Sequence, residues 1–342
     1  LVDTSLGSLC SLDTTEPSVT IKEKNSDTTI EKKIVINGDE KVDSNSAGIG
    51  DTVNFSITIT VKDGAPKGYV LHDQLSGLTF DPNSLEVKVG TKTLNPNTDY
   101  TLVTNPTDGD SFDVNFTDGK LKPNDVVVVT YSATVAANAT ITGEGNTNKA
   151  KLEYSGKVST EEKTTTYVWK LNVHKYTLNS TNDEVALNGA KFVLYRKDGT
   201  DKKYYAKLTG GKIDGWVTNQ SDATTLETTG TGDISIEGLN VGTYYLEETE
   251  APAGYNKLTG PIEVEITATT SATSGSETVH YKNSSETSYT LATDATVKVL
   301  NSAGTQLPST GGIGTTLFYV IGGVLMAVAA VLLVTKKRMN NK

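Results

Sequence analysis

The sequence predicts an all-β protein with two tandem β-sandwich domains, followed by a C-terminal transmembrane helix. Short runs rich in Val, Ile and Thr alternate with polar residues across residues 28–165, and turn residues separate them. A second set of such runs extends from residue 167 to residue 301, and a long apolar run occupies residues 313–334. Alternation with a period of two residues is typical of strands, and many short strands favour a sandwich or a barrel.

The composition narrows the possible functions. At 342 residues the chain is long enough for two domains that each bury a core. The formal net charge is -10, which argues against nucleic acid as a partner because phosphates attract Lys and Arg. The single cysteine, Cys10, cannot form an intramolecular disulfide, so any covalent stabilisation must come from another chemistry.

Residues 1–27 are interpreted as a remnant or linker of a longer protein. Residues 1–16 lack the basic start and apolar core of a secretory signal, although a chain whose main part precedes a transmembrane helix and lies outside the membrane must be exported. We therefore expect the natural chain to begin before Leu1, and we expect Cys10 to belong to what is left of that preceding part.

The first domain is expected at residues 28–165 and the second at residues 166–304. A charged, Thr-rich stretch at residues 161–166 is interpreted as the linker between them. The first strand of the second domain is expected to begin at Tyr167 and the last to end at Asn301. Apolar positions alternate along both of these strands, and no convincing amphipathic helix appears.

Residues 305–342 contain a short polar pentapeptide, the apolar run and a basic end. The run exceeds the roughly 20 residues that a helix needs to cross a bilayer, and the basic residues 336–338 would stay on the cytoplasmic side. This order resembles the LPxTG cell-wall sorting signal of Gram-positive surface proteins. The resemblance implies that a sortase cleaves between Thr310 and Gly311, transfers the acyl group to an amine and discards the span. The pentapeptide consists of Leu307, Pro308, Ser309, Thr310 and Gly311.

Residues 244–255 match the whole of the E-box, YxLxExxAPxGY, and so resemble pilin domains of the Cna protein B type, which are SpaA-like. Residues 187–192 resemble the LxGAxF signature of the same domains. The resemblance implies an Ig-like sandwich in which a first-strand lysine and a last-strand asparagine form a spontaneous isopeptide bond. The E-box glutamate promotes that reaction in the family.

Strand phase indicates which residues could form this bond. Lys175, Asn301 and Glu248 each lie in phase with apolar residues of their own strand, so all three would point into the core. Burial penalises charged forms, so the amine would be a neutral nucleophile and the carboxyl would keep its proton. Protonated Glu248 could then polarise the Asn301 carbonyl and transfer protons as ammonia leaves, without a cofactor.

The first domain resembles the Ig-like D2 domain of isopeptide-forming fimbrial backbone proteins. Looser motifs at residues 49–53, 69–78 and 145–154 carry this resemblance. It implies a triad of a first-strand lysine, an aspartate that promotes the reaction and a last-strand asparagine. Asp73, which lies in phase with neighbouring apolar residues, is the expected acid.

Two positions of the first-domain triad have alternatives. Lys32 lies in phase with three isoleucines, whereas Lys33 lies in phase with polar residues, so Lys32 is preferred over Lys33. Asn148 fits the asparagine of the family. Asn146 has the same phase, and the choice between Asn148 and Asn146 stays open.

The remaining candidates do not indicate a catalytic or metal site. His72, His174 and His280 are dispersed and lack metal-ligand spacing, so each is interpreted as a solvated strand position. No Ser-His-Asp order or pair of carboxylates suggests a hydrolase. We expect no cofactor, no metal and no enzymatic activity apart from autocatalytic isopeptide formation.

The leading interpretation is a structural subunit of a sortase-assembled pilus (fimbria) that is anchored to peptidoglycan at a Gram-positive cell surface and contributes to adhesion. The expected partners are sortase, other pilin subunits, peptidoglycan and a host surface protein or glycan, with no nucleic acid and with the membrane only before cleavage. The alternative is a monomeric wall-anchored adhesin that binds a host protein or glycan. It is kept because no WxxxVxVYPK-like pilin motif with a polymerising lysine is found.

Overall fold

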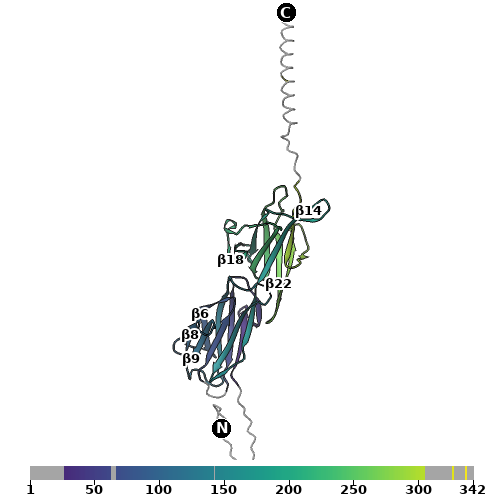
Figure 1. Ribbon diagram of the computed structural model, residues 1–342. Helices are drawn as coiled ribbons and strands as arrows, with labels where there is room; N and C mark the ends of the chain where they lie inside the picture. The colour runs from purple at the N-terminus through teal and green to yellow at the C-terminus, as the bar shows by residue number, and fades with distance from the viewer. Residues whose placement is uncertain (1–26, 63–66, 142, 305–325, 327–335, 337–342) are drawn as a thin grey trace, which may run out of the picture.

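The structure is a computed structural model that describes residues 27–62, 67–141 and 143–304 and the isolated positions 326 and 336 (Figure 1). Within residues 27–62, 67–141 and 143–304 the chain folds almost entirely into strands and turns, with one short 3-10 helix, η1 (Gln220–Asp222), which confirms the predicted all-β class. Cys10, the pentapeptide and most of the apolar run lie outside the described residues. Within the described part of the chain, no helix has both the length and the apolar character that a bilayer crossing requires.

Two sheets form the first unit. The six-stranded sheet has the order β2-β1-β4-β10-β6-β7, and the other has the order β3-β13-β11-β5-β9-β8 with β12 paired to β11. The strands of the first sheet are β1 (Thr29–Ile36), β2 (Glu40–Val42), β4 (Thr52–Thr60), β6 (Leu78–Val89), β7 (Lys92–Thr93) and β10 (Val126–Val135). Those of the second are β3 (Ser44–Ser46), β5 (Val70–Leu75), β8 (Tyr100–Thr104), β9 (Phe112–Phe116), β11 (Asn146–Tyr154), β12 (Lys157–Val158) and β13 (Glu162–Tyr167).

These two sheets pack face to face because alternate residues of their strands are apolar. Along β10, Val127, Val129 and Tyr131 are buried while the residues between them are partly exposed. The rings of Phe80 on β6 and Phe112 on β9 stack across the two sheets with centroids 4.0 Å apart. The first unit is therefore a sandwich with a single apolar core between its sheets.

The turn between β5 and β6 requires a glycine. Gly77 has a φ of 68°, and a Cβ atom there would come within 1.9 Å of Asn146 Oδ1. Only glycine fits a position that combines a left-handed backbone with so close a neighbour. The turn consequently packs directly on the start of β11.

One long sheet forms the second unit. Its order is β15-β14-β20-β18-β17-β16-β21-β22-β23-β24, with β19 paired to β16 and β25 paired to β14. The first six strands along the chain are β14 (Trp169–Leu178), β15 (Glu184–Ala186), β16 (Lys191–Lys197), β17 (Lys203–Thr209), β18 (Lys212–Val217) and β19 (Leu226–Glu227). The others are β20 (Asp233–Leu239), β21 (Gly242–Glu250), β22 (Ile262–Thr270), β23 (Gly275–Lys282), β24 (Thr290–Leu291) and β25 (Thr296–Leu300).

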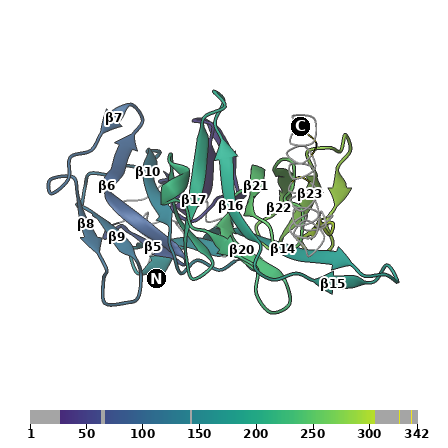
Figure 2. The ribbon, with the colours of Figure 1, turned by 90° about the horizontal axis from the view of Figure 1, so that it is seen from above.

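This long sheet curls so that distant strands face each other. Figure 2 shows β16, β21, β22 and β23 succeeding one another above β14 and β20 in that view. Asn301, which directly follows β25, donates a hydrogen bond to Glu248 on β21, although several strands separate β25 from β21 in the sheet. Alternate residues of β14 point into the enclosed core, and Trp169, Leu171 and Val173 are fully buried.

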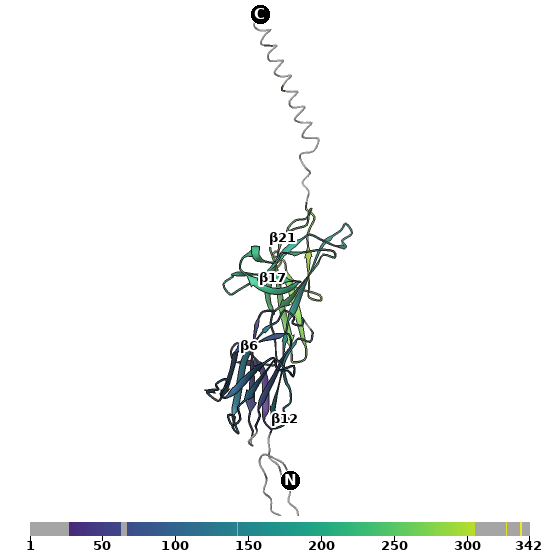
Figure 3. The same cartoon turned by 60° about the vertical axis from the view of Figure 1, so that its left-hand side comes forward.

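Residues 161–166, which were interpreted as a linker, are mostly part of β13, so that interpretation is wrong. The strand pairs with β11 and with β3, and residues 164–166 are buried. The charged and Thr-rich composition hid the strand because Thr favours both loops and strands. After β13 only Val168 intervenes before β14, and the two units lie end to end (Figure 3).

The junction between the units is held by polar contacts. Trp169 Nε1 donates to Ser46 Oγ at 3.0 Å, and the Ile49 amide donates to the Gly238 carbonyl at 2.9 Å. Asn240 Nδ2 donates to Asp51 Oδ2 at 3.0 Å. Each of these bonds joins one unit to the other, so the short connection does not leave them independent.

Candidate functional site: two buried lysine clusters

The second unit brings Lys175, Glu248 and Asn301 together in its core, where they form the second cluster. β25 runs parallel to β14 with Lys175 opposite Val299, and the Asn301 amide donates to the Tyr176 carbonyl at 3.0 Å. Lys175 Nζ lies 3.1 Å from the Val299 carbonyl oxygen and 4.0 Å from Glu248 Oε1. Asn301 Nδ2 donates to the same Glu248 Oε1 at 2.9 Å. The carboxyl group therefore lies next to the amine and the amide nitrogen, and not next to the Asn301 carbonyl oxygen that it was expected to polarise.

This cluster is closed to solvent. The side chains of Lys175 and Glu248 are 0% exposed, and Asn301 is 1% exposed. Burial lowers the pKa of Lys175 to about 8, against the opposing effect of the Glu248 charge. Asn301 Oδ1 is buried without a hydrogen-bond partner. A readily neutralised amine thus lies beside an amide whose carbonyl oxygen is unpaired.

The segment that resembles the LxGAxF signature helps to position Lys175. The Leu187 amide donates to the Lys175 carbonyl at 2.9 Å, and the Lys175 amide donates to the Gly232 carbonyl at 2.9 Å. A Cβ atom on Gly232, whose φ is 80°, would lie 2.5 Å from the Lys175 carbonyl oxygen. The backbone around Lys175 is therefore fixed on both sides.

The first unit has its own buried lysine cluster, the first cluster, between its two sheets. Lys32 on β1 is ion-paired with Asp73 Oδ2 on β5, and its Nζ donates to the Tyr131 hydroxyl on β10 at 2.6 Å. That hydroxyl donates to Asp73 Oδ2 at 2.8 Å and accepts from Asn148 Nδ2 on β11 at 2.8 Å. Tyr131 therefore bridges the lysine, the aspartate and the asparagine.

Burial sets the charge preferences of this first cluster. It lowers the pKa of Lys32, and the neighbouring Asp73 charge opposes that shift. It raises the pKa of Asp73, which the Lys32 charge opposes, and it raises the pKa of Tyr131 well above its usual value. Asn148 Oδ1 is again buried without a hydrogen-bond partner. Both units thus combine a lysine, an acid and an asparagine with a free carbonyl oxygen.

The alternative residues occupy different environments. Lys33 Nζ pairs with Asp43 at 2.7 Å at the surface. Asn146 donates to the carbonyls of Thr140 and Thr166 and accepts from the Thr140 amide at 2.8 Å. Neither residue has a hydrogen bond to Asp73 among these contacts. The geometry favours Lys32 and Asn148. Asn148 lies on β11, and β13 follows as a later strand of the same sheet, so this asparagine is not on the last strand of the first unit as expected.

Tyr131 is a member of the first cluster that was not predicted from the sequence. Its hydroxyl is central to the first cluster, and the residue is 3% exposed. Inward alternation along residues 126–135 puts Tyr131 in phase with buried valines, where a phenol needs a polar partner. That phase was a signal available in the sequence, but the identity of the partner depended on β1, β5 and β11.

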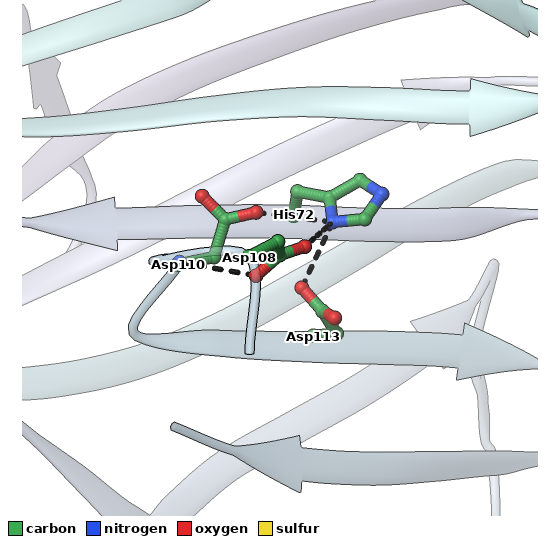
Figure 4. A group of neighbouring side chains, drawn as sticks. All are labelled: His72, Asp108, Asp110 and Asp113. Carbon is green, nitrogen blue, oxygen red and sulfur yellow. Dashed lines mark hydrogen bonds and ion pairs between the residues drawn. The ribbon is translucent and has the colours of Figure 1, made fainter. Parts of the chain in front are cut away.

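The interpretation of His72 as a solvated strand position is wrong. Its side chain is only 12% exposed and lies among Asp108, Asp110 and Asp113 (Figure 4). The aspartates come from β9 and the segment before it, far from His72 in sequence, so local spacing could not reveal them. His174 is more exposed, at 24%, and its Nδ1 lies 2.6 Å from Asp233 Oδ1.

Comparison with known proteins gives two separate matches, one over most of the second unit and one over the C-terminal residues that follow it. Residues 170–278 match the SpaA prealbumin-like fold domain, and residues 300–341 match the LPXTG cell wall anchor motif. The chain carries a SpaA-type domain and a cell-wall anchor motif. These matches confirm the predicted SpaA-like domain and the predicted location at the cell wall and cell surface.

Relatives extend the likeness over most of the chain. The trypsin-resistant surface T6 protein of Streptococcus pyogenes serotype M6 is 24% identical and aligns with 92% of this chain and 70% of that protein. The solved group B streptococcus pilus 2b backbone protein is 24% identical with a TM-score of 0.60, covering 81% of this chain and 99% of that chain. The Streptococcus pneumoniae pilus backbone RrgB is 16% identical with a TM-score of 0.56, covering 81% of this chain and 100% of that chain. The structural likeness is one of fold.

Proposed function

We propose that the chain is a structural subunit of a sortase-assembled pilus on a Gram-positive cell surface, stabilised by one isopeptide bond in each unit. The observation that carries this proposal is the pair of buried lysine–acid–asparagine clusters ahead of a cell-wall anchor motif. The names of the similar proteins, a surface protein and two pilus backbones, support it. In this proposal the chain is a sortase substrate and not an enzyme.

In the second unit the bond would join Lys175 Nζ to the side-chain carbon of Asn301. The neutral amine attacks the Asn301 amide carbon, the new carbon–nitrogen bond forms, and the old amide nitrogen leaves as ammonia. Glu248 would accept the proton that the amine loses and deliver one to the leaving nitrogen, which it already contacts at 2.9 Å. The preformed contact replaces a high reagent concentration, so no cofactor is required.

In the first unit the same reaction would join Lys32 to Asn148, with Asp73 as the acid. Tyr131 contacts the amine, the acid and the amide nitrogen, so its hydroxyl would relay protons between them. Lys33 and Asn146 are not part of this proposal because other partners already occupy them.

We also propose a division of the chain that follows the clusters. Residues 28–165 would form the fimbrial D2-like domain, and residues 166–304 the SpaA-like domain. Residues 1–27 would be a preceding linker, and residues 305–342 the sorting signal. The pairing of β13 with β3, which includes Tyr167, supports moving this boundary by two residues, so that the first domain would end at Tyr167.

The sorting signal would provide the intermolecular linkage. Sortase would cut between Thr310 and Gly311 and transfer the Thr310 acyl group to an amine of another pilin subunit or of peptidoglycan. A wall-anchored adhesin that binds a host protein or glycan would use the same signal without polymerising. The two possibilities therefore differ in the size of the wall-linked product.

Replacing the scissile threonine tests this step. We expect Thr310→Ala to abolish wall linkage, because sortase would have no acyl group that it recognises, and to leave the protein in the membrane and medium. Ser309→Ala, at the variable position of the motif, is the matched control and should stay wall-linked. Immunoblots of wall, membrane and medium fractions measure the distribution.

The same blots separate a pilus subunit from a monomeric adhesin. Ladders of high molecular mass that survive boiling in detergent are expected from the native strain and should disappear with Thr310→Ala. Wall extracts that contain only monomer, with the natural N-terminus present, would reject the pilus role in favour of the adhesin.

The rate of bond formation in the second unit should rise with pH. Burial lowers the pKa of Lys175 to about 8, so below that value most of the amine carries a proton and cannot attack. We expect the rate to increase about tenfold per unit up to about pH 7 and to level off above about pH 8. Cell-free synthesis in buffers of different pH, followed by mass spectrometry over time, measures it. Glu248→Ala is the unreactive control, and a rate independent of pH would contradict the neutral-amine mechanism.

A further inference from the structure

The first unit contains another group of polar side chains, centred on His72, that takes no part in the lysine clusters. His72 on β5 faces Asp113 on β9 and the segment between β8 and β9, which carries Asp108 and Asp110. Figure 4 shows the three carboxyl groups gathered on the side of the imidazole that carries Nδ1. One potential ligand atom from each residue can be chosen so that all four lie within 4.8 Å of one another.

The distances suit ligands that share one ion. His72 Nδ1 lies 2.9 Å from Asp113 Oδ1, 3.1 Å from Asp110 Oδ2 and 3.6 Å from Asp108 Oδ2. Nitrogen and oxygen ligands bind Zn²⁺ at about 2.0–2.2 Å, which puts neighbouring ligand atoms about 3.0–3.6 Å apart. Small side-chain movements would therefore complete a coordination shell.

Asp110 gives an independent indication that a ligand is needed. Its side chain is only 9% exposed, and its Oδ2 atom is buried without a hydrogen-bond partner. The imidazole can direct at most one N–H from Nδ1, and Asp113 Oδ1 is the nearer acceptor. The nearest lysine, Lys151, lies 3.9 Å from Asp110 Oδ2, so a single lysine faces three aspartates. A divalent cation would satisfy the unpaired oxygen and offset the excess negative charge.

We propose that His72, Asp108, Asp110 and Asp113 bind a divalent transition-metal ion of the Zn²⁺ or Mn²⁺ class. Imidazole is a preferred ligand of zinc and its neighbours, whereas calcium and magnesium prefer oxygen ligands alone. The other ring nitrogen, Nε2, lies 3.6 Å from Glu153 Oε2, and a carboxylate behind a ligating histidine orients it towards the metal.

The local backbone holds the ligands in place. Gln74 Nε2 donates to the Gly109 carbonyl at 3.1 Å, and the Leu75 amide donates to Ser111 Oγ at 2.9 Å. The Ser111 amide donates to the Asp73 carbonyl at 2.7 Å. A bound ion would thus attach the β8–β9 connection to β5, directly behind the acid of the first lysine cluster.

Metal titration of the full chain tests this site. The chain is purified in detergent without a histidine tag, stripped with EDTA and titrated with ZnCl₂, with calorimetry for affinity and elemental analysis after dialysis for stoichiometry. We expect one Zn²⁺ per chain, and a higher unfolding temperature with zinc than without it. His72→Gln and Asp108→Asn should each weaken binding by at least about 100-fold, because each removes a direct ligand.

The controls make either outcome informative. His174→Gln removes a histidine that also pairs with an aspartate, Asp233, outside the cluster, and it should bind zinc like the wild type. Asp108 is 46% exposed, so Asp108→Asn should fold even if His72→Gln does not. Undiminished zinc binding by Asp108→Asn and by folded His72→Gln would overturn the proposal. Wild-type protein that binds neither Zn²⁺ nor Mn²⁺, or that binds only Ca²⁺, would also overturn it.

Discussion

The intact protein is expected to weigh roughly 34 Da less than its sequence mass, because each isopeptide bond releases one ammonia of roughly 17 Da. Glu248→Ala should regain roughly 17 Da relative to its own sequence mass, since the second unit loses the acid that contacts Asn301. Asp73→Ala should regain the same amount through the first unit. Intact-mass spectrometry measures both changes.

Matched controls test whether the mass change requires a residue of the cluster or follows from removing any charged side chain nearby. Glu250→Ala removes an exposed glutamate of the same strand, which pairs with Lys191 at the surface, and it should keep the full deficit. Lys33→Ala should likewise keep the deficit, because Lys33 pairs with Asp43 outside the cluster. A wild-type mass equal to the sequence mass would reject both bonds.

The second large effect is expected from Lys175→Met combined with Glu248→Gln, which removes both charges of the buried pair. Replacing a whole buried ion pair by uncharged side chains of similar size often leaves stability unchanged or improves it. If Lys175 is bonded to Asn301, the same substitutions open a covalent loop of about 126 residues, which costs about 5 kcal/mol in the loop-entropy picture. The bonded and unbonded states of Lys175 therefore predict opposite signs.

Urea unfolding monitored by Trp fluorescence, with both Trp169 and Trp216 in the second unit, measures this difference. Lys170→Met, five residues earlier on the outward side of β14, controls for the added apolar surface and should change stability little. A Lys175→Met, Glu248→Gln double variant as stable as the wild type would show that no covalent link constrains the second unit.

Strand phase predicted much of the second cluster correctly because side chains alternate strictly along a strand. Lys175, Glu248 and Asn301 were each expected to point inward, and each is buried. The same reasoning preferred Lys32 over Lys33, and Lys32 is the buried one. Periodicity carries this information because it is local to a single strand.

The features that were missed depend on contacts between strands that are distant in sequence. Tyr131 becomes a bridge only when β10 faces β5 and β11 across the core. His72 meets three aspartates only because β9 pairs with β5. The β13 strand is identified from its pairing with β11 and β3, since its charged and Thr-rich composition fits a loop as well as a strand. No local pattern encodes these pairings.

The parallel pairing of β25 with β14 determines how the second unit would carry tension along the chain. Because the two strands run the same way, the chain enters the unit near Trp169, and Asn301 lies at the opposite end of β14, close to where the chain leaves the unit. With Lys175 bonded to Asn301, a pull on both ends would pass through the few residues from Trp169 to Lys175 and directly across the bond. Residues 176–300 would lie outside the load path, so the unit would transmit tension without lengthening.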